Sequence, residues 1–290
     1  MRKSRYPIAI ALVVLVIAAA CGRTAPAPAQ GPLSFLVTND DGVQAPGIAA
    51  LAEALKPLGT VTVAAPDGNR SGASHGVNSE GPITVREEER DGVRWLAIDA
   101  MPATCVRLAV EELLPSKPDL VLSGINRGEN LGTVTFYSAT VGAAREAAFL
   151  GIPAIAVNLV AGKGMDYRTA AGVVVEIVRS VGRTGIAPGT LLNVNIPPLP
   201  RERLRGLRIT RQDTRAPVDF FRKVPTPEGP TAYWPGWRHL DPEGQGTDIW
   251  AVRNGYVSVS VFGFDQSAAA PPAASVTLKR LERLLPPIAD

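Results

Sequence analysis

The stretch SFLVTNDDG (34–42) decides the fold, because an apolar run of strand length ends directly in a polar turn. Further runs rich in apolar and β-branched residues follow at intervals along the chain. They lie at 60–65, 119–123, 153–158 and 191–196. Runs of this length and composition are typical of strands that are buried on both faces of a sheet.

Segments with helical periodicity separate these runs, and each places its apolar residues on one stripe. The stripes comprise Ile48, Leu51 and Leu55, then Val106, Val110 and Leu113, and then positions within 139–150 and 170–181. The alternation of strand and helix predicts an α/β fold with a doubly wound, mostly parallel sheet. Ligands of such sheets bind beyond the carboxyl ends of the strands.

The sequence changes character at about Arg201, where strand-like sequence with Pro, Gly and Trp begins. It includes the alternating stretch YVSVSVF (256–262). We therefore expect an α/β core at 33–200 and an antiparallel, β-rich extension or arm at 201–266. The remaining segment, 267–290, is expected to hold a linker (267–274) and a short amphipathic helix (276–285) that packs on the core.

The N-terminus predicts an export signal. Residues 1–20 combine a positively charged start with an apolar run, 8–20, that is too short to span a bilayer comfortably. The run ends in AAACG, which resembles a bacterial lipoprotein processing site with Cys21 as the lipidated residue. A simple cleaved signal is the alternative. Residues 21–32 are then a flexible tether, and the protein is expected in the cell envelope, lipid-anchored or periplasmic.

The charge balance points to small substrates. Three of the 30 basic residues lie in the signal, and the other 27 balance 27 acidic residues. Without a basic excess, binding to a nucleic-acid polymer is disfavoured. Cys105 is the only cysteine beyond Cys21, so we expect no disulfide within the chain, and its apolar helical context indicates a buried small side chain.

Adjacent carboxylates follow the first strand. Asp40 and Asp41 repel each other unless a cation neutralises them, and no His or Cys lies nearby. Oxygen ligands alone suit a hard divalent ion such as Mg²⁺ or Mn²⁺. The alternative is that Asn-Asp-Asp-Gly is only a turn with a helix cap.

Polar loops follow two further strands. The loop 65–74 offers hydroxyls and an arginine, and the loop 123–132 offers amide oxygens. The latter runs into YSAT (137–140), where a helix is expected to begin. The free amides of a helix N-terminus bind anions, although Ser138 is equally suited to be a plain N-cap. Three such loops at one edge of the sheet favour a functional site.

Five stretches together resemble a known family. They are LVTNDDGVQAPGI (36–48), VAAPDGNRSGAS (63–74), PDLVLSGINRGENLGT (118–133), YSATVGAAREAAFLGIPAIAV (137–157) and LLNVNIP (191–197). They are similar to the stationary-phase survival proteins, the SurE family, which are metal-dependent 5′/3′-nucleotidases. The likeness runs in order from about residue 34 to at least residue 262. It implies a Rossmann-like core with a C-terminal β arm that is exchanged between subunits, giving homodimers or homotetramers.

The resemblance also implies a site. One Mg²⁺ or Mn²⁺ per subunit would be held by Asp40, Asp41, Ser71 and Asn126. The expected reaction is hydrolysis of nucleoside 5′- and 3′-monophosphates, with metal-activated water attacking phosphorus. The alternative is that Asp40 or Asp41 acts as the nucleophile or as a general base. The two aspartates are contiguous, however, and so do not form the D-x-D motif of aspartyl-phosphate phosphatases. The candidates for phosphate binding or transition-state stabilisation are Asn39, Asn130, Ser138 and Thr140.

The chain departs from the family pattern near the expected site. Thr104 replaces an Asp, Val134 replaces an Asp, and Ala139 replaces a Gly at the start of a helix. A methyl group at Ala139 is expected to crowd an incoming phosphate, which bears on the rate more than on the metal. The lipoprotein-type signal is also unusual, because the family is associated with the cytoplasm, which is therefore the alternative location.

A serine esterase and a binding protein are the rival functions. GASHG (72–76) matches the G-x-S-x-G motif around Ser74, and His239 lies downstream with Asp213 and Asp219 between. Loops on both sides of Ser74 replace the strand and helix that such a motif joins. The third possibility is a catalytically impaired, nucleotide-binding lipoprotein.

Overall fold

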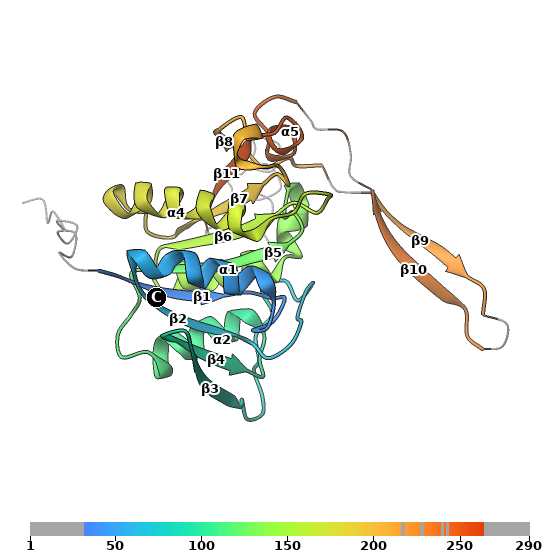
Figure 1. Ribbon diagram of the computed structural model, residues 1–290. Helices are drawn as coiled ribbons and strands as arrows, with labels where there is room; N and C mark the ends of the chain where they lie inside the picture. The colour runs from blue at the N-terminus through green and yellow to red at the C-terminus, as the bar shows by residue number, and fades with distance from the viewer. Residues whose placement is uncertain (1–31, 216–217, 227–228, 239–240, 242–243, 264–290) are drawn as a thin grey trace, which may run out of the picture. The chain divides into compact units, whose positions relative to one another are not determined.

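A mixed sheet forms the centre of the computed structural model, which describes residues 32–215, 218–226, 229–238, 241 and 244–263 (Figure 1). Its strand order is β3-β4-β2-β1-β5-β6-β7-β11-β8. The strands are β1 (Leu33–Thr38), β2 (Gly59–Pro66), β3 (Val85–Arg90), β4 (Val93–Ile98), β5 (Leu120–Arg127), β6 (Ala154–Leu159), β7 (Thr190–Ile196), β8 (Leu207–Thr210) and β11 (Val257–Gly263). All neighbours from β4 to β7 pair in parallel, whereas β3 and β11 run antiparallel to β4 and β7. The predicted fold class is confirmed.

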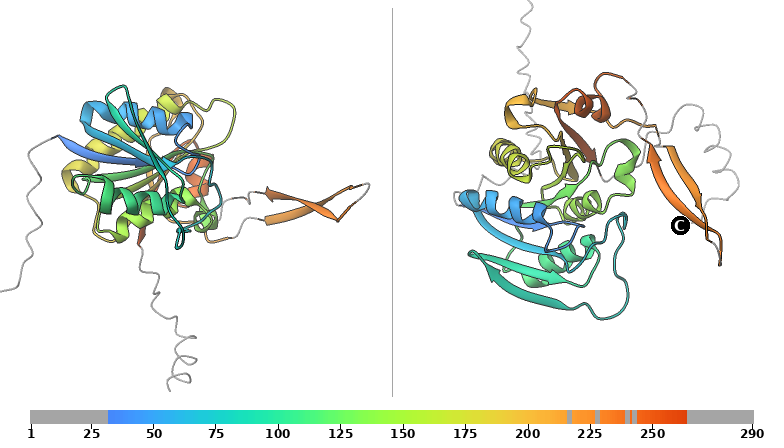
Figure 2. Two further views of the ribbon diagram at one scale, coloured as in Figure 1. Left: turned by 90° about the horizontal axis from the view of Figure 1, so that it is seen from below. Right: turned by 45° about the vertical axis from the view of Figure 1, so that its right-hand side comes forward.

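Helices cover both faces of the sheet (Figure 2). The α-helices are α1 (Pro46–Leu55), α2 (Pro102–Leu108), α3 (Ala139–Phe149), α4 (Tyr167–Thr184) and α5 (Asp248–Arg253). Short helical turns are η1 (Lys56–Leu58), η2 (Ala109–Leu113), η3 (Gly132–Phe136) and η4 (Arg201–Arg203). Successive residues of β1 enter opposite cores: Val37 packs with α1 and α4, and Leu36 packs with α2 and α3. This alternation explains why the run Phe35, Leu36 and Val37 is apolar at successive positions.

Two strands of the sheet, β3 and β4, were not predicted from the sequence. β3 reads VREEER and is largely exposed at the edge of the sheet, so it carries no apolar run. β4 reads VRWLAI and buries Trp95, Leu96 and Ile98, but Arg94 interrupts its pattern. Edge strands of this charged kind resist pairing with other chains.

The segment 201–266 contains the expected antiparallel pair, but other parts of it join the main sheet. β8 and β11 belong to the main sheet, with β8 parallel to β11, and α5 is a helix where strand was expected. Among the described strands, β9 (Val218–Val224) and β10 (Ala232–Arg238) alone form a separate antiparallel pair (Figures 1 and 2). The main sheet therefore extends beyond the expected boundary at residue 200, because the alternating pattern of β11 suits a half-buried strand in a mixed sheet as well as an arm.

The predicted signal at 1–20, most of the tether at 21–32 and the helix at 276–285 lie outside the described residues. Among the helices that the structure describes, none combines the length and apolar character needed to cross a membrane.

Candidate active site

The turn after β1 is shaped by Asn39. The Asn39 amide nitrogen donates to the Gly42 carbonyl oxygen over 2.9 Å, and the Gly42 N–H donates to the Asn39 amide oxygen over 3.2 Å. Gly42 has a positive φ of 102°, and a side chain there would lie 3.0 Å from the Gly68 carbonyl carbon. Both ends of the Asn39 amide thus hold the turn that presents Asp40 and Asp41. A phosphate contact of Asn39 stays a prediction.

Asp40 is a buried carboxylate, with 3% of its surface exposed. The Thr140 hydroxyl donates to its Oδ1 over 2.6 Å, and the Arg70 N–H donates to its backbone carbonyl over 2.7 Å. Burial raises the pKa of Asp40 from 3.8 to about 6, the Thr140 hydrogen bond lowers it, and the charge of Asp41 raises it again. The chain therefore compensates the Asp40 charge only partly, which favours a bound cation.

Asp41 is half-buried and faces the end of β5. Its Oδ2 accepts the Arg127 N–H over 3.0 Å, and burial raises the pKa of Asp41 despite this hydrogen bond. Asn126, the residue before, is 9% exposed, and its amide nitrogen donates to the Gly128 carbonyl over 3.0 Å. This bond uses the nitrogen and leaves the amide oxygen as the atom that Asn126 offers to a metal.

The loop with Ser71 is fixed to the start of α3. Ser71 itself is exposed, and its hydroxyl accepts a hydrogen bond from the Asn69 amide over 3.1 Å. Ser74 donates twice, from its N–H to the Tyr137 carbonyl over 3.1 Å and from its hydroxyl to the Phe136 carbonyl over 2.5 Å. Together with the Arg70 contact to Asp40, these bonds join the predicted loops at one edge of the sheet.

An ion cluster beneath this loop was not predicted. Glu146 of α3 is 2% exposed and contacts His75 Nε2 over 2.8 Å and the Arg107 guanidinium. Burial alone raises the pKa of Glu146, but the His75 hydrogen bond and the Arg107 charge outweigh it, so the pKa lies below its ordinary value. The only sequence signal was a glutamate among the alanines of α3.

The start of α3 carries Ser138, Ala139 and Thr140, all buried. The Ser138 hydroxyl accepts the Val141 N–H over 3.1 Å, which is the N-cap that the sequence left open as an alternative. Thr140 points its hydroxyl to Asp40. Ala139 is fully buried as the first residue of the helix, so its methyl group occupies space at the helix N-terminus.

Asn130 belongs to a buried asparagine cluster. Its amide nitrogen donates to the Asn158 amide oxygen over 2.6 Å, and its N–H donates to the Asn195 amide oxygen over 2.9 Å. Asn193 donates to the Asn130 carbonyl over 2.8 Å. The cluster ties the third loop to β6 and β7. Its sequence signal was the asparagines within the apolar runs PAIAVN and LLNVNI.

The donors at this edge fit a hard cation. Within the described residues, no three His, Cys, Asp or Glu side chains gather as a metal-binding group. The two carboxylates and the nearby amide and hydroxyl groups offer oxygen atoms, which are the ligands that hard divalent cations prefer. The hydroxyls of Thr38 and Ser123 are also buried there without a hydrogen-bond partner among the described residues. Thr38 is the last residue of β1 and lies opposite Ser123 in the middle of β5.

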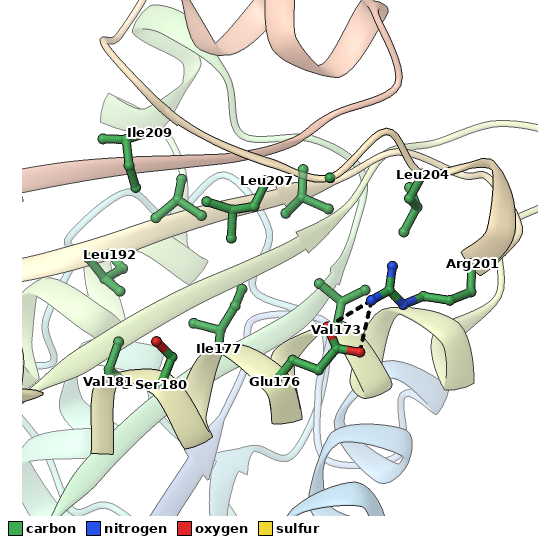
Figure 3. Close-up of a pocket in the computed structure, with 13 residues that line it drawn as sticks. Val173, Glu176, Ile177, Ser180, Val181, Leu192, Arg201, Leu204, Leu207 and Ile209 are labelled. Carbon is green, nitrogen blue, oxygen red and sulfur yellow. Dashed lines mark hydrogen bonds and ion pairs between the residues drawn. The ribbon is translucent and has the colours of Figure 1, made fainter. Parts of the chain in front are cut away.

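A cavity of about 570 Å³ opens beside Asp41. We call it the Asp41 cavity, and its walls are Asp41, Gln44, Ala45, Pro46, Arg127, Met165 and Tyr167. A second hollow, the α4 groove, has a volume of about 440 Å³ and lies between α4, β8 and β11 (Figure 3). Its lining is mostly apolar, with an ion pair between Glu176 and Arg201 at 2.8 Å (Figure 3). The two hollows share no lining residue.

The described residues form no Ser-His-Asp triad around Ser74, as a serine esterase would require. Ser74 has a positive φ of 55°, but its hydroxyl donates to a backbone carbonyl. His75, the one histidine that the structure describes, bonds to Glu146. Asp213 is buried elsewhere, with its N–H bonded to Asp248 and its carboxylate to Arg215. His239 lies outside the described residues.

The departures from the family pattern lie around the site. Thr104 in α2 accepts the Asn78 N–H over 2.9 Å and so supports the far end of the Ser71 loop. Val134 is half-buried in η3. The neighbouring Cys105 is fully buried, and burial raises the pKa of its thiol, as expected for a structural cysteine.

Comparisons with known proteins agree with the architecture. A family model described as Survival protein SurE matches residues 35–219. A 5′-nucleotidase SurE of Geobacter sulfurreducens is 46% identical over 236 residues, which are 80% of this chain and 88% of that protein. Another, of Methylococcus capsulatus, is 41% identical over 234 residues, covering 80% and 92%. The crystal structure of the SurE protein from Aquifex aeolicus matches with a TM-score of 0.75 and 42% identity, covering 86% of this chain and 99% of that one.

Proposed function

The chain belongs to the SurE family, and on that premise we propose that it is a 5′-nucleotidase that hydrolyses the phosphate ester of nucleoside monophosphates. The observation that carries the proposal is the pair of adjacent carboxylates at the carboxyl edge of the sheet. Asp40 is held by Thr140 and Asp41 by the main chain of Arg127. Relatives named 5′-nucleotidase SurE support the substrate class.

The proposal includes one divalent cation per subunit, Mg²⁺ or Mn²⁺. Its ligands are Asp40, Asp41, Ser71 and Asn126, which offer only oxygen atoms. The raised pKa of both aspartates supports a cation, because burial leaves their charges under-compensated. When bound, the cation polarises the phosphoryl group and lowers the pKa of water. Activity toward 3′-monophosphates is proposed as well.

The chain's own residues fix the geometry. Thr140 donates to Asp40 and so orients one carboxylate, while the Arg127 N–H orients the other. Ser138 and the first-turn amides of α3 are proposed to bind the phosphate, with Asn130 as a further phosphate contact. Water is the proposed nucleophile, because the aspartates are contiguous and do not form a D-x-D motif.

We also propose a location and an oligomeric state for the protein. The N-terminal sequence supports export and a lipid anchor at Cys21, with no other membrane contact. A homodimer or homotetramer is proposed, in which β9 and β10 of one subunit pack on another. The separate antiparallel pair supports this, because two strands without a further layer are marginally stable alone.

Phosphate release from a panel of nucleoside 5′- and 3′-monophosphates tests the proposal. The purified protein is assayed with Mn²⁺, Mg²⁺ or EDTA, beside Asp40→Asn and with a carboxylic ester as a control substrate. We expect metal-dependent release that both EDTA and the substitution abolish. Release that persists in EDTA would refute the metal role, whereas EDTA-insensitive ester cleavage would favour Ser74.

A folded protein that binds Mn²⁺ but releases no phosphate from any nucleotide would refute the enzyme. The catalytically impaired binding protein would then be the better assignment. Ala139→Gly is the variant that separates the two, because it removes the methyl group at the start of α3. Activity that appears only in Ala139→Gly would show that this methyl group blocks the phosphate.

A further inference from the structure

The Asp41 cavity extends the candidate site away from the sheet. Its walls come from the turn before α1, from the end of β5 and from the start of α4. At about 570 Å³ it falls within the range of about 300 to 1,000 Å³ that small-molecule sites occupy. Asp41 itself lies in the wall, so a molecule whose phosphate reaches Asp40 and Asp41 can place its remainder here.

Tyr167 forms a fixed aromatic wall. It is the first residue of α4, which Asp166 caps by accepting the N–H groups of Arg168 and Thr169. The ring packs over Gly47 of α1, where an added side chain would lie 3.0 Å from Tyr167 Cε1 and 2.0 Å from the Ile125 carbonyl oxygen. The glycine thus makes room for the ring. A half-buried aromatic ring held from two helices is suited to stacking with a flat ligand.

The other walls suit an uncharged ring with polar edges. Met165 adds a half-buried thioether next to Tyr167, and Gln44 adds an exposed amide whose oxygen accepts a hydrogen bond from the Arg90 guanidinium over 3.2 Å. The charged side chains in the wall, Asp41 and Arg127, have opposite signs.

We propose that the Asp41 cavity is the nucleoside subsite, in which the base of a nucleoside monophosphate stacks on Tyr167 and Met165 and meets the Gln44 amide at its polar edge. The inference rests on the proposed nucleotidase and adds the residues that read the substrate beyond its phosphate. Phosphate and ribose lie toward Asp41, and the base lies toward the start of α4. Tyr167 is then a specificity residue that touches the substrate and takes no part in breaking the ester.

Paired substrates isolate the base. Adenosine 5′-monophosphate and ribose 5-phosphate carry the same phosphate ester, but only the first has a base. We expect Tyr167→Ala to lower kcat/KM for the nucleotide by about tenfold, mainly through KM, because stacking of a base on an aromatic ring is worth about that much. For ribose 5-phosphate we expect a change within about twofold. Tyr167→Phe, the matched control, keeps the ring and is expected to resemble the wild type.

Binding of adenosine in EDTA gives a second readout that needs neither metal nor turnover. Calorimetry is expected to show weaker binding to Tyr167→Ala and to Met165→Ala, and unchanged binding to Tyr167→Phe. Met165→Ala keeps the proposal testable if Tyr167→Ala does not fold. Equal losses for both substrates, or adenosine binding that neither alanine variant weakens, would overturn the subsite. Absence of hydrolysis by the wild type refutes only the proposed function, because adenosine binding still tests the cavity.

Discussion

The Asp41 cavity and the α4 groove differ in the side chains that line them. The Asp41 cavity has in its wall the Asp41 carboxylate, whose pKa is raised by burial, and it lies where parallel strands end. The α4 groove is lined by aliphatic side chains such as Ile177, Leu192 and Leu207 (Figure 3). The apolar groove therefore lacks the groups that the proposed chemistry needs. Polar atoms that are costly to bury lie instead at the edge where we propose the active site.

The ion pairs of the two regions differ in how far their side chains are buried. Glu146 is 3% exposed at its side chain and holds His75 beneath the Ser71 loop. In the groove, Glu176 and Arg201 pair at 2.8 Å with side chains 58% and 53% exposed. Exposed pairs contribute little to stability, whereas the loss of a buried partner is costly. Substitutions at matched positions in the two regions are thus expected to differ in effect.

The largest effect is expected from Asp40→Asn. Loss of a metal-binding carboxylate should lower kcat/KM by about a thousandfold or more, equivalent to about 4 kcal/mol. The stability of the folded protein should increase, whereas its activity decreases. An ionised carboxylate at this buried position opposes folding, so the variant should melt several degrees higher in EDTA. Nucleotide kinetics and thermal melting measure the two effects.

The contrast between the two regions would fail if Asp40→Asn had a lower melting temperature than the wild type in EDTA and kept full activity. Asp40 would then be an ordinary structural carboxylate. Asp241 supplies a control, because its carboxylate is exposed and forms an ion pair with Arg253 at 3.0 Å. Asp241→Asn should leave both activity and melting temperature unchanged.

A smaller effect is expected at Thr140. Its hydroxyl orients Asp40 over 2.6 Å, and groups that orient a metal ligand are typically worth about 10- to 100-fold in metal affinity or activity. Thr140→Val keeps the shape and removes the hydroxyl, so Mn²⁺ affinity measured by calorimetry should fall by that factor. Thr140→Ser restores the hydroxyl and should recover most of the affinity. Equal affinity in the valine and serine variants would contradict this role.

Glu146→Gln should act chiefly on stability, with a cost of about 1.5 to 3 kcal/mol because a hydrogen bond to a charged group is lost. The folded-state pKa of Glu146 lies below its ordinary value of 4.5. Its ionised form therefore stabilises the fold above that pH, and the contribution disappears as the pH falls through the folded-state pKa. Melting temperatures of wild type and variant should differ most at pH 7 and converge below pH 4.5.

Glu176→Gln is the matched control for Glu146→Gln, since it removes the same charge from a helix ion pair that is exposed. Its effect on unfolding should stay within about 0.5 kcal/mol at any pH. Equal destabilisation by the two variants would remove the contrast between the regions. A difference that grows as the pH falls would refute the assigned role of Glu146.

The sequence sufficed for the parts of the molecule that rest on local pattern. The apolar runs of β1, β2, β5, β6 and β7 were predicted because each strand is buried on both faces. The loops that follow β1, β2 and β5 were brought together correctly, since parallel strands end at one edge. The family resemblance is confirmed by the matching family model.

Hydrogen bonds between residues that are distant in the sequence were not predicted. The contact between Thr140 and Asp40 spans 100 residues, and that between His75 and Glu146 spans 71. Neither leaves a periodic signal. β3 was missed because its exposed edge carries charges, and α5 because six helical residues follow a β-rich context. The hydrogen bonds of Asn130 were not predicted for the same reason, because its partners Asn158 and Asn195 lie on later strands.

The smallest effect is expected from the groove itself. Ile209 lines it with 70% of its surface exposed, so Ile209→Thr removes little buried apolar area. The free energy of unfolding should change by less than about 0.5 kcal/mol, and nucleotide kcat/KM should be unchanged. Chemical denaturation and the phosphate-release assay measure these quantities. A large loss of activity would show that the groove is coupled to the site and that the two hollows are not independent. Unchanged activity with a changed oligomeric state, measured by light scattering, would instead assign the exposed edge of β8 to assembly.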